Sequence, residues 1–459
     1  MNSLANFNLE KGSVKSLVQK ALTSAASRGE ALTPQSLEQL ITNAVVRLSP
    51  EIAMISTKSV AAKVHEFNRM NQLPAIGGAI GEGATTPTRF SRYERAFREL
   101  KVIRRKGAVT NFLQDASREY IDAAAIEMEN HLVAHVNDMV TYLVHGNEVA
   151  DPYQFPGWDR FISTNRINEA VGGVVPTTLG FLDDMIDLNL ERQGAGHRKA
   201  FLMSPQMLSK VSQLLTNVRL NQGLSAGGMS TVDIPGGWRL NAYRDIPIVQ
   251  SAQTRPRASA LTVSTATATT GGELPNATEY FFRVSRITWD GESIPSAEVS
   301  ETTGGSTGTH TVTLSWTAPG DAVLYKIYVG TSTGDLTLHS VVPAFTYDAD
   351  GTPTGALEEF VMTAAGASAS VPVHMRDDRP LVQTGGVSPE SVYLIDLDEV
   401  QGLGKFAYTN TAGSRFQGLV TMEPLAKTDD FLPFLIKTYG TTIDAFEATS
   451  VAHRGLRVS

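Results

Sequence analysis

The stretch NFLQDASREYIDAAAIEMENHLVAHVNDMVTYLVHG (111–146) decides the fold of this chain. From Ala116 to about His145, apolar side chains recur every three or four residues, which predicts one long amphipathic helix. They are Ile121, Ala124, Met128, Leu132, Val136, Met139 and Leu143. Asp115 stands where an N-cap belongs and Gly146 where a C-terminal stop belongs. At about 1.5 Å per residue the helix would be about 45 Å long, so it must cross a whole domain or act as its spine.

Downstream of this helix, helical and strand patterns follow one another. KAFLMS (199–204) predicts a buried strand, and helices are expected on either side of it, from about Leu179 and from Ser204-Pro205. Further predicted strands are WRLNAY (238–243), IPIVQS (246–251), VYLID (392–396), KFAYTN (405–410), FQGLVTM (416–422) and TTIDAF (441–446). This order predicts a mixed α+β host fold.

Upstream of the helix the chain is a series of segments without a core of their own. Residues 1–50 contain two short amphipathic helical patterns, the second ended by Ser49-Pro50, and we interpret them as an arm that packs on something else. Residues 74–88 are a Gly-rich loop. The basic stretch 89–106 is ambiguous, because Phe90, Tyr93, Phe97 and Leu100 have helical spacing whereas Leu100 and Val102 alternate as in a strand.

The amino-acid composition changes between about Ala258 and Gly351, where Thr, Ser, Gly and Val dominate. Runs such as HTVTLSWTAPGDAVLYKIYVG (310–330), with turn signals at short intervals, are typical of a small β-sandwich. We therefore expect a sandwich inserted into the host fold. An insertion of this kind is tolerated where its ends reach the surface.

Composition excludes several classes of protein. The chain has 459 residues, 42% hydrophobic and 19% charged, which indicates an ordered globular protein of several domains. It has no cysteine, so disulfides, thiolate metal sites and cysteine nucleophiles are excluded. The formal net charge of −8 argues against a surface that coats nucleic acid throughout. We find neither a signal-peptide pattern nor an apolar run long enough for a membrane helix.

Candidate chemistry is sparse. His131 and His135 lie on one helix face and could share a zinc ion, but HLVAH lacks a glutamate base and a third ligand, so two polar helix positions are the better interpretation. The glycines of GGAIGEG (77–83) lack the flanking strand and helix of a phosphate site. No nucleophile elbow, phosphate-binding loop or convincing carboxylate pair is present. We expect no enzymatic activity, cofactor or metal.

Charge suggests contact between copies. A basic arm and an acidic helix in one chain favour charge-complementary contacts between subunits over nucleic-acid binding. The residues that we predict for these contacts are Arg89, Arg92, Arg95, Arg98, Arg104, Arg105, Glu119, Asp122, Glu127 and Glu129.

The order of these motifs resembles the major capsid proteins of tailed bacteriophages, of the Hong Kong 97 type. The resemblance covers roughly 50–255 and 387–459. It rests on the residues Gly81, Glu82, Pro87, Val109, Thr110, Leu113, Asp115, Gly146, Pro156, Gly157, Met203, Ser204, Pro205, Gly236, Gly237, Tyr243, Pro247 and Val249. The inserted module resembles fibronectin type III or other immunoglobulin-like domains, through residues such as Tyr280, Trp316 and Tyr328, with Trp316 as the expected core anchor.

The resemblance implies an α+β capsid fold with a definite division of the chain. It gives an N-terminal arm (1–59), an extended loop (60–110) that would be a β-hairpin, a spine helix with the peripheral domain (111–175), an axial domain (176–257), the inserted sandwich (258–351), a return to the axial domain (352–415) and peripheral C-terminal strands (416–459).

The function implied is self-assembly into the icosahedral head of a tailed double-stranded DNA phage, in the virion after assembly in the host cytoplasm. Partners would be the chain itself in hexamers and pentamers, portal, scaffolding and decoration proteins, and packaged DNA bound without sequence specificity, with no membrane. The alternatives are an encapsulin-like bacterial compartment with protein cargo and a surface carbohydrate-binding or adhesive protein. We also expect that deleting 258–351 leaves shells intact.

Overall fold

The computed structural model describes residues 49–459, except 73, 76–78, 80–81, 83–84, 87, 118–121, 170–171, 193, 223–228, 235–237, 255–258, 306–308, 384, 399–401, 410–418 and 427–429. The helical patterns expected within 1–48 lie outside these residues. In this part of the chain the helices are α3 (Pro50–Met54), α4 (Asn111–Ser117), α5 (Ala123–His145), α6 (Trp158–Phe161), α7 (Gly180–Glu191) and α8 (Pro205–Gln222), with short 3-10 turns η1 (Ala252–Thr254) and η2 (Val373–Met375).

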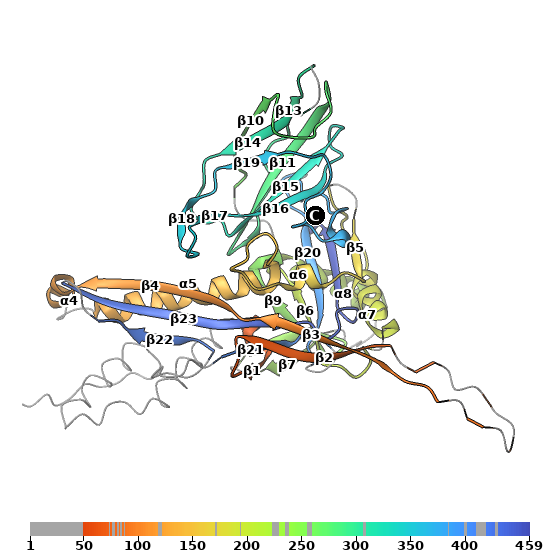
Figure 1. The fold of residues 1–459 in the computed structure, drawn as a ribbon. Coiled ribbons are helices and arrows are strands. Elements are labelled where there is room, and N and C mark those ends of the chain that lie inside the picture. Colours follow the sequence, from red (N-terminus) through yellow and green to blue (C-terminus); the bar gives the residue numbers. More distant parts are fainter. Residues whose placement is uncertain are drawn as a thin grey trace, which may run out of the picture.

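A five-stranded sheet packs on the long helix α5 (Figure 1). The central strand is β23. Strands β22 and β21 pair with successive parts of one of its edges, β1 pairs with β21, and β4 pairs along its other edge. The strands are β1 (Ser56–Ser59), β4 (Lys101–Thr110), β21 (Lys405–Tyr408), β22 (Thr421–Pro424) and β23 (Phe431–Ile443). Alternate residues of β23, such as Phe434 and Ile436, enter the core beneath α5 with Leu132, Val136 and Met139. The sheet therefore has one face against the helix and one face turned away from it.

A seven-stranded sheet forms the second layer of the body, in the order β5-β24-β20-β6-β9-β8-β7. The strands are β5 (Arg166–Asn168), β6 (Lys199–Met203), β7 (Met229–Ile234), β8 (Trp238–Tyr243), β9 (Ile246–Gln250), β20 (Glu390–Asp396) and β24 (Val451–Leu456). Helices α7 and α8 cover it, with Leu182, Met185, Met207 and Val211 in the shared core. The helix–strand–helix unit predicted around KAFLMS is confirmed.

The inserted segment forms two sheets around one core and rises from the body on the side of α5 (Figure 1). One sheet is β10-β14-β19 and the other is β12-β11-β15-β16, with β13 paired to β11. The strands are β10 (Val263–Ala268), β11 (Glu279–Thr288), β12 (Gly291–Glu292), β13 (Val299–Thr302), β14 (Thr311–Trp316), β15 (Leu324–Gly330), β16 (Thr337–Pro343) and β19 (Glu359–Met362), with a hairpin of β17 (Phe345–Tyr347) and β18 (Pro353–Ala356). We call residues 259–381 the β-module. Trp316 lies in its core as expected, with its ring 4.9 Å from that of Tyr325.

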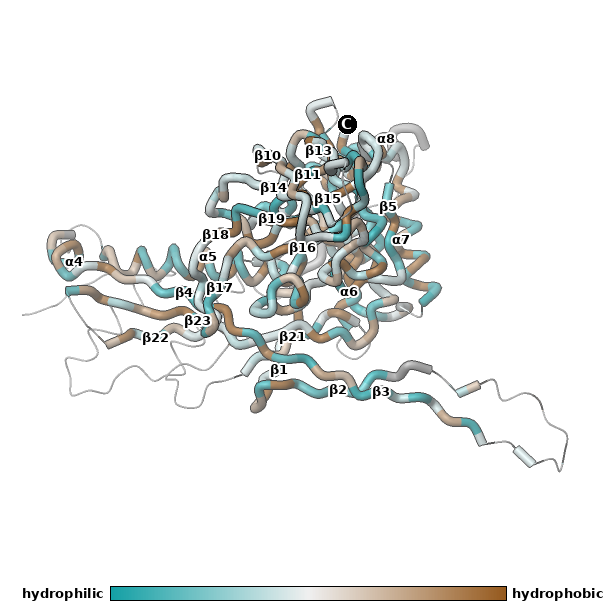
Figure 2. The backbone as a smooth tube through the Cα atoms, turned by 45° about the horizontal axis from the view of Figure 1, so that its top comes forward, coloured by the Kyte–Doolittle hydropathy of each residue, from teal (hydrophilic) through white to brown (hydrophobic). Residues whose placement is uncertain are grey.

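The extended loop expected over 60–110 contains an antiparallel strand pair in its described residues, whereas its last part, Lys101–Thr110, is strand β4 of the five-stranded sheet. β2 (Val64–Gln72) and β3 (Arg92–Glu99) pair with each other in antiparallel register and with no other strand. We call this pair the ribbon. It points away from the body, and hydrophobic and hydrophilic residues are interleaved along it (Figures 1 and 2). The helical spacing of Phe90, Tyr93 and Phe97 was misleading.

The long helix starts later than predicted. Asp122, not Asp115, is the N-cap of α5, because its carboxylate accepts a hydrogen bond from the Ala125 amide at 3.1 Å. The Gln114 side chain accepts another from the Ala124 amide at 2.9 Å, which satisfies a second free amide of the first turn. Asp115 lies within the separate helix α4. With 23 residues, α5 is about 35 Å long, and Gly146 ends it as predicted.

Two expected divisions of the chain differ in the structure, and Ser49-Pro50 also starts a helix of its own. Strand β21 was placed in the axial part and β24 in the peripheral part, but β21 pairs with β23 under α5 and β24 pairs with β20 in the seven-stranded sheet. The module does not end at Gly351, because β19 pairs with its strand β14. Ser49-Pro50 begins helix α3, since the Ser49 hydroxyl accepts from the Ile52 amide at 3.4 Å and proline is favoured in the first turn.

Candidate functional site

The ribbon exposes large apolar side chains that the described part of the chain leaves uncovered. Tyr93 is 69% exposed and Phe97 70% exposed, although both lie in a hydrogen-bonded strand. They share one face of the ribbon, because residues two apart in a strand point the same way. Val64, 40% exposed, is on the same face, since it lies opposite Glu99. An isolated two-stranded hairpin is marginally stable in water, so an exposed apolar face of this kind is suited to contact with another surface.

Ion pairs fix the base of the ribbon to the body. Arg98 binds Asp444 through two nitrogens at 2.9 and 2.8 Å, and its guanidinium lies 5.1 Å from the ring centre of Phe161. Bidentate pairs of this kind fix orientation as well as distance. Glu99 binds Lys101 at 2.7 Å and Lys63 at 2.8 Å, and these contacts lower its pKa to about 2. The ribbon thus leaves the body in a defined direction.

The β-module also contacts the long helix directly. The Trp289 indole donates to Asp138 on α5 at 2.8 Å. Arg105 of β4 pairs with the same carboxylate at 2.7 Å and lies 5.3 Å from the centre of the Trp289 ring. One aspartate therefore joins three elements, namely the helix, the strand that continues into the ribbon, and the module.

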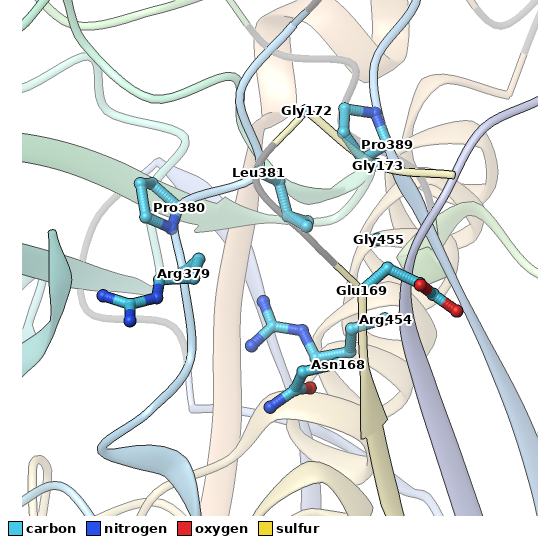
Figure 3. Close-up of a pocket in the computed structure, with 10 residues that line it drawn as sticks. All are labelled: Asn168, Glu169, Gly172, Gly173, Arg379, Pro380, Leu381, Pro389, Arg454 and Gly455. Atoms are coloured by element: carbon cyan, nitrogen blue, oxygen red, sulfur yellow. The ribbon is translucent and has the colours of Figure 1, made fainter. Parts of the chain in front are cut away.

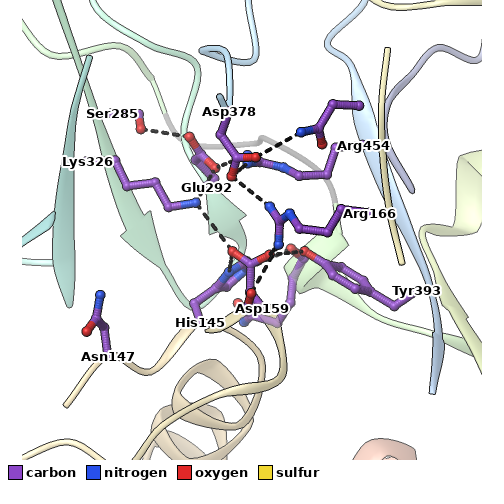
Figure 4. A network of polar contacts seen from close by, with 12 residues as sticks. His145, Asn147, Asp159, Arg166, Ser285, Glu292, Lys326, Asp378, Tyr393 and Arg454 are labelled. Atoms are coloured by element: carbon purple, nitrogen blue, oxygen red, sulfur yellow. Dashed lines mark hydrogen bonds and ion pairs between the residues drawn. The ribbon is translucent and has the colours of Figure 1, made fainter. Parts of the chain in front are cut away.

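A buried ionic cluster joins the β-module to the body (Figure 4). It contains three carboxylates and three cations, none of which exposes more than 5% of its side chain. They are Asp159, Glu292, Asp378, Arg166, Lys326 and Arg454. The cluster is neutral overall, which is the condition under which buried charges are tolerated.

Positive and negative side chains alternate in the cluster, from the β-module to the body. Lys326 of β15 reaches Glu292 at 3.0 Å and Asp159 of α6 at 3.6 Å. Arg454 of β24 binds Glu292 at 3.0 Å and also pairs with Asp378, which Arg166 holds at 2.7 Å. Burial alone would raise the pKa of Glu292, but the charges of Lys326 and Arg454 lower it to about 2. The charge of Arg166, followed by that of Lys326, likewise holds the pKa of Asp159 below its usual range despite burial. Because the cluster combines side chains of the module with side chains of the body, it connects the two parts of the structure.

Two kinds of cavity lie near this junction. A small one between Glu169, Gly172, Leu381 and Arg454 measures about 20 Å³, room for about one water (Figure 3). A wider cleft of about 460 Å³ runs along the β-module, and its charged lining residues are Asp335, Asp377, Arg376 and Arg379. Arg379 and Asp335 pair with each other at 2.7 Å. Neither cavity brings together a nucleophile and a base.

The two histidines that sequence analysis weighed as zinc ligands have different hydrogen-bond partners. His131 binds Glu127 at 3.1 Å, and the buried His135 binds the Thr438 hydroxyl at 2.8 Å. Burial, with the charge of Arg105, lowers the pKa of His135 to about 3. Among the described residues no three His, Asp or Glu side chains gather in a way that could hold a metal ion. No helix of the described ranges is long and apolar enough to cross a membrane.

The residues predicted for contacts between copies are dispersed. Arg98 and Arg105 have partners within the chain, and the exposed Arg95 lies 3.4 Å from Glu66. Arg89, Arg92, Arg104 and Glu129 are exposed, Glu127 binds His131, and Asp122 caps α5, while Glu119 lies outside the described residues. Contact of these side chains with another copy remains a prediction. Sequence analysis missed the ionic cluster, whose signal was charged residues inside apolar runs, such as Lys326 in VLYKIYV.

No protein-family model matches the chain, and no curated protein matches it. Solved structures do match along most of its length. The SrpI encapsulin complex of Synechococcus elongatus aligns over 90% of this chain and 89% of its own, with 10% identity and a TM-score of 0.44. The capsid of cyanophage A-1(L) covers 89% and 93%, with 11% identity and a TM-score of 0.42. A structure of Mycobacterium phage Ogopogo covers 88% and 91%, with 10% identity and a TM-score of 0.41.

Proposed function

We propose that this chain is the major capsid protein of a tailed double-stranded DNA bacteriophage and assembles with copies of itself into an icosahedral head. The observation that carries the proposal is the ribbon, a long appendage whose apolar face is left open by the residues that the structure describes. The order of hairpin, long helix and two sheets agrees with what the sequence resemblance implies. The role is structural, and no bond is made or broken.

The ribbon and the opposite end of the body supply two different apolar surfaces. At the far end of α5, Phe112 is 78% exposed, Leu113 52% and Phe431 44%. The ribbon lies at the other end of the molecule (Figure 1). When one of these surfaces on one copy binds the other surface on the next copy, the contact is head to tail. Such contacts close into a ring when the rotation between neighbouring copies permits. Rings of five and six copies would be the pentamers and hexamers of the shell.

The finer features of the proposal concern orientation and partners. The β-module would lie on the outer surface of the shell, where an insertion has room. An immunoglobulin-like relationship of the module is consistent with its two sheets around one core. Portal, scaffolding and decoration proteins and packaged DNA would be the partners in the virion, after assembly in the host cytoplasm.

Electron microscopy of the purified full-length chain tests the proposal. We expect shells of uniform diameter, and a Tyr93→Ser/Phe97→Ser variant should remain unassembled with an unchanged unfolding midpoint. The matched control is Val361→Ser/Val373→Ser, which removes two exposed apolar side chains of the β-module, 43% and 75% exposed, and should still assemble.

Two results would contradict the proposal. One is a native chain that stays monomeric under every assembly condition, and the other is a ribbon variant that assembles as well as the control. Shells that contain protein and no nuclease-protected DNA when isolated from their natural source would instead indicate a compartment of the encapsulin kind.

A further inference from the structure

The face of the five-stranded sheet that is turned away from α5 gathers positive charge. Strand register determines which residues share it, because directly opposed residues point to the same side. Arg104 lies opposite Lys437, and Lys106 opposite Leu435. Lys405 lies opposite Ile443, and Lys58 of β1 is in register with Ala407 of β21. We call this surface the basic face, and its cations are Lys58, Arg104, Lys106, Lys405 and Lys437.

Strand alternation separates the basic stretch of the sequence into two groups. Arg105 turns toward α5 and pairs with Asp138, whereas its neighbours Arg104 and Lys106 are exposed on the basic face. Of the five cations on this face, only Lys437 is paired, with Glu423 at 2.7 Å. Throughout the described part of the chain, no carboxylate lies within ion-pair distance of Lys58, Arg104, Lys106 or Lys405.

This concentration does not follow from the composition. The chain has 39 Lys and Arg against 47 Asp and Glu, so an average surface would carry slightly more carboxylates than cations. Among the residues that the structure describes on the paired strands of this sheet, the basic face has five cations and the single carboxylate Glu423. The same charges act on His65, because burial and then Lys58 and Lys405 lower its pKa. The described residues therefore leave much of the positive charge on this face without a neutralising partner.

We propose that the basic face binds the phosphate backbone of nucleic acid, without reading its sequence, through Lys58, Arg104, Lys106 and Lys405. The inference rests on the proposed function and adds an orientation to it. The β-module rises on the α5 side of the sheet, where Trp289 contacts Asp138 (Figure 1). The basic face would therefore look into the shell and the module out of it.

The dimensions of the basic face suit an extended polyanion. On β23, Lys437 lies opposite Arg104 and Ile443 lies opposite Lys405. Six residues of a strand span about 20 Å. Duplex DNA carries one charge per about 1.7 Å of its axis, so a stretch of this length presents many phosphates to a few cations. Contacts of this kind neutralise charge and release counterions, which makes binding dependent on salt.

Salt-dependent binding of a short fluorescein-labelled DNA duplex to the unassembled full-length chain tests the inference. The variant Arg104→Gln/Lys106→Gln should bind more weakly. It should also lower the slope of log affinity against log salt, between about 50 and about 200 mM, by about 2, one unit per lost phosphate contact. The matched control is Arg192→Gln/Arg376→Gln, two exposed cations away from the basic face, which should leave affinity and slope unchanged.

The outcomes separate this inference from the proposed function. Shell formation of each variant is measured in parallel by electron microscopy, and the basic-face variant should still assemble. Equal DNA affinities for the two double variants would overturn the inference while leaving the capsid proposal intact. Loss of assembly in the basic-face variant, or tighter binding of poly-glutamate than of DNA, would assign the basic face to protein contacts and also overturn it. A native chain that binds DNA without forming shells would contradict the proposed function alone.

Discussion

The ribbon and the β-module both extend from the same body, but they are held in opposite ways. Each has a glutamate whose pKa is lowered to about 2 by two cations, Glu99 at the base of the ribbon and Glu292 at the base of the module. Glu99 keeps 42% of its side chain exposed, whereas Glu292 keeps 4%. Similar ion pairs therefore act in water in one case and in a buried junction in the other. The module is fixed by its own subunit, whereas the proposed function assigns the exposed face of the ribbon to contact with a neighbour.

Removing each region should show the largest difference. Deletion of 258–351 should abolish soluble expression, because it removes Glu292 and Lys326 from the buried cluster and leaves β19 without its partner strand. This differs from the expectation based on sequence, which treated the segment as dispensable. Replacement of residues 66–97 by an Asn-Gly turn keeps His65 opposite Arg98 and removes Tyr93 and Phe97, so it should leave a soluble, cooperatively folded chain that does not assemble. Expression, circular dichroism and microscopy give the readouts. A soluble, folded module deletion would show that the cluster is not a structural connection.

A single charge in the cluster should have a large effect on stability. Lys326→Met leaves three buried carboxylates against two cations, and breaking a buried pair in this way costs about 3–5 kcal/mol. The matched change on the ribbon is Arg95→Met, which breaks an exposed pair with Glu66 and should cost roughly 0–1 kcal/mol. Urea unfolding of the two unassembled variants measures both. Similar losses would mean that burial does not distinguish the two regions.

Lowering the pH should change the stabilising contributions of Glu292 and Glu99 by different amounts. Because the folded pKa of Glu292 is about 2, below the 4.5 of a free glutamate, its stabilising contribution is complete above about pH 4.5 and is lost as the pH falls toward 2. Between pH 6 and pH 3 this one group should account for about 2 kcal/mol of lost stability. Unfolding of Glu292→Gln at the two pH values should show a smaller loss than the native chain. Glu99→Gln should behave as the native chain does, since solvent screens its pairs, and equal curves for both variants would contradict the assignment.

The smallest expected effect is at the contact between the module and the long helix. Trp289→Phe keeps an aromatic ring beside Arg105 but removes the indole donor to Asp138, a loss of about 1 kcal/mol. Tyr93→Phe on the ribbon, a change of similar size at an exposed side chain, should leave the unfolding midpoint of the unassembled chain unchanged. A larger loss for the ribbon variant would reverse the comparison.

Much of the fold could be predicted from sequence, because periodicity and turn residues are local. The long helix, its end at Gly146, the strand KAFLMS and the β-texture near Trp316 all follow from residues close in the chain. The start of α5 could not be predicted, since Asp115 and Asp122 are both good caps and the choice depends on Gln114 folding back. The extended hairpin came from the resemblance and against the local spacing of Phe90, Tyr93 and Phe97.

The candidate sites were harder to predict from the sequence than the fold was. The basic stretch was recognised, but only the pairing of β4 with β23 shows that Arg104 and Lys106 point away from Arg105. The ionic cluster combines residues from 159 to 454, and no local pattern links such distant positions. Charged residues within apolar strands were the only sequence signal for the cluster, and this signal does not indicate which residues pair.

The neutrality of the buried cluster also limits how this chain can change over generations. Three of its six members, Glu292, Lys326 and Asp378, arrive with the β-module, while Asp159, Arg166 and Arg454 belong to the host. A lineage that discarded the insertion would have to rebuild the vacated host surface in the same step, and one that acquired it had to supply matching charges. The module and its host are therefore expected to be inherited together, as one unit of descent.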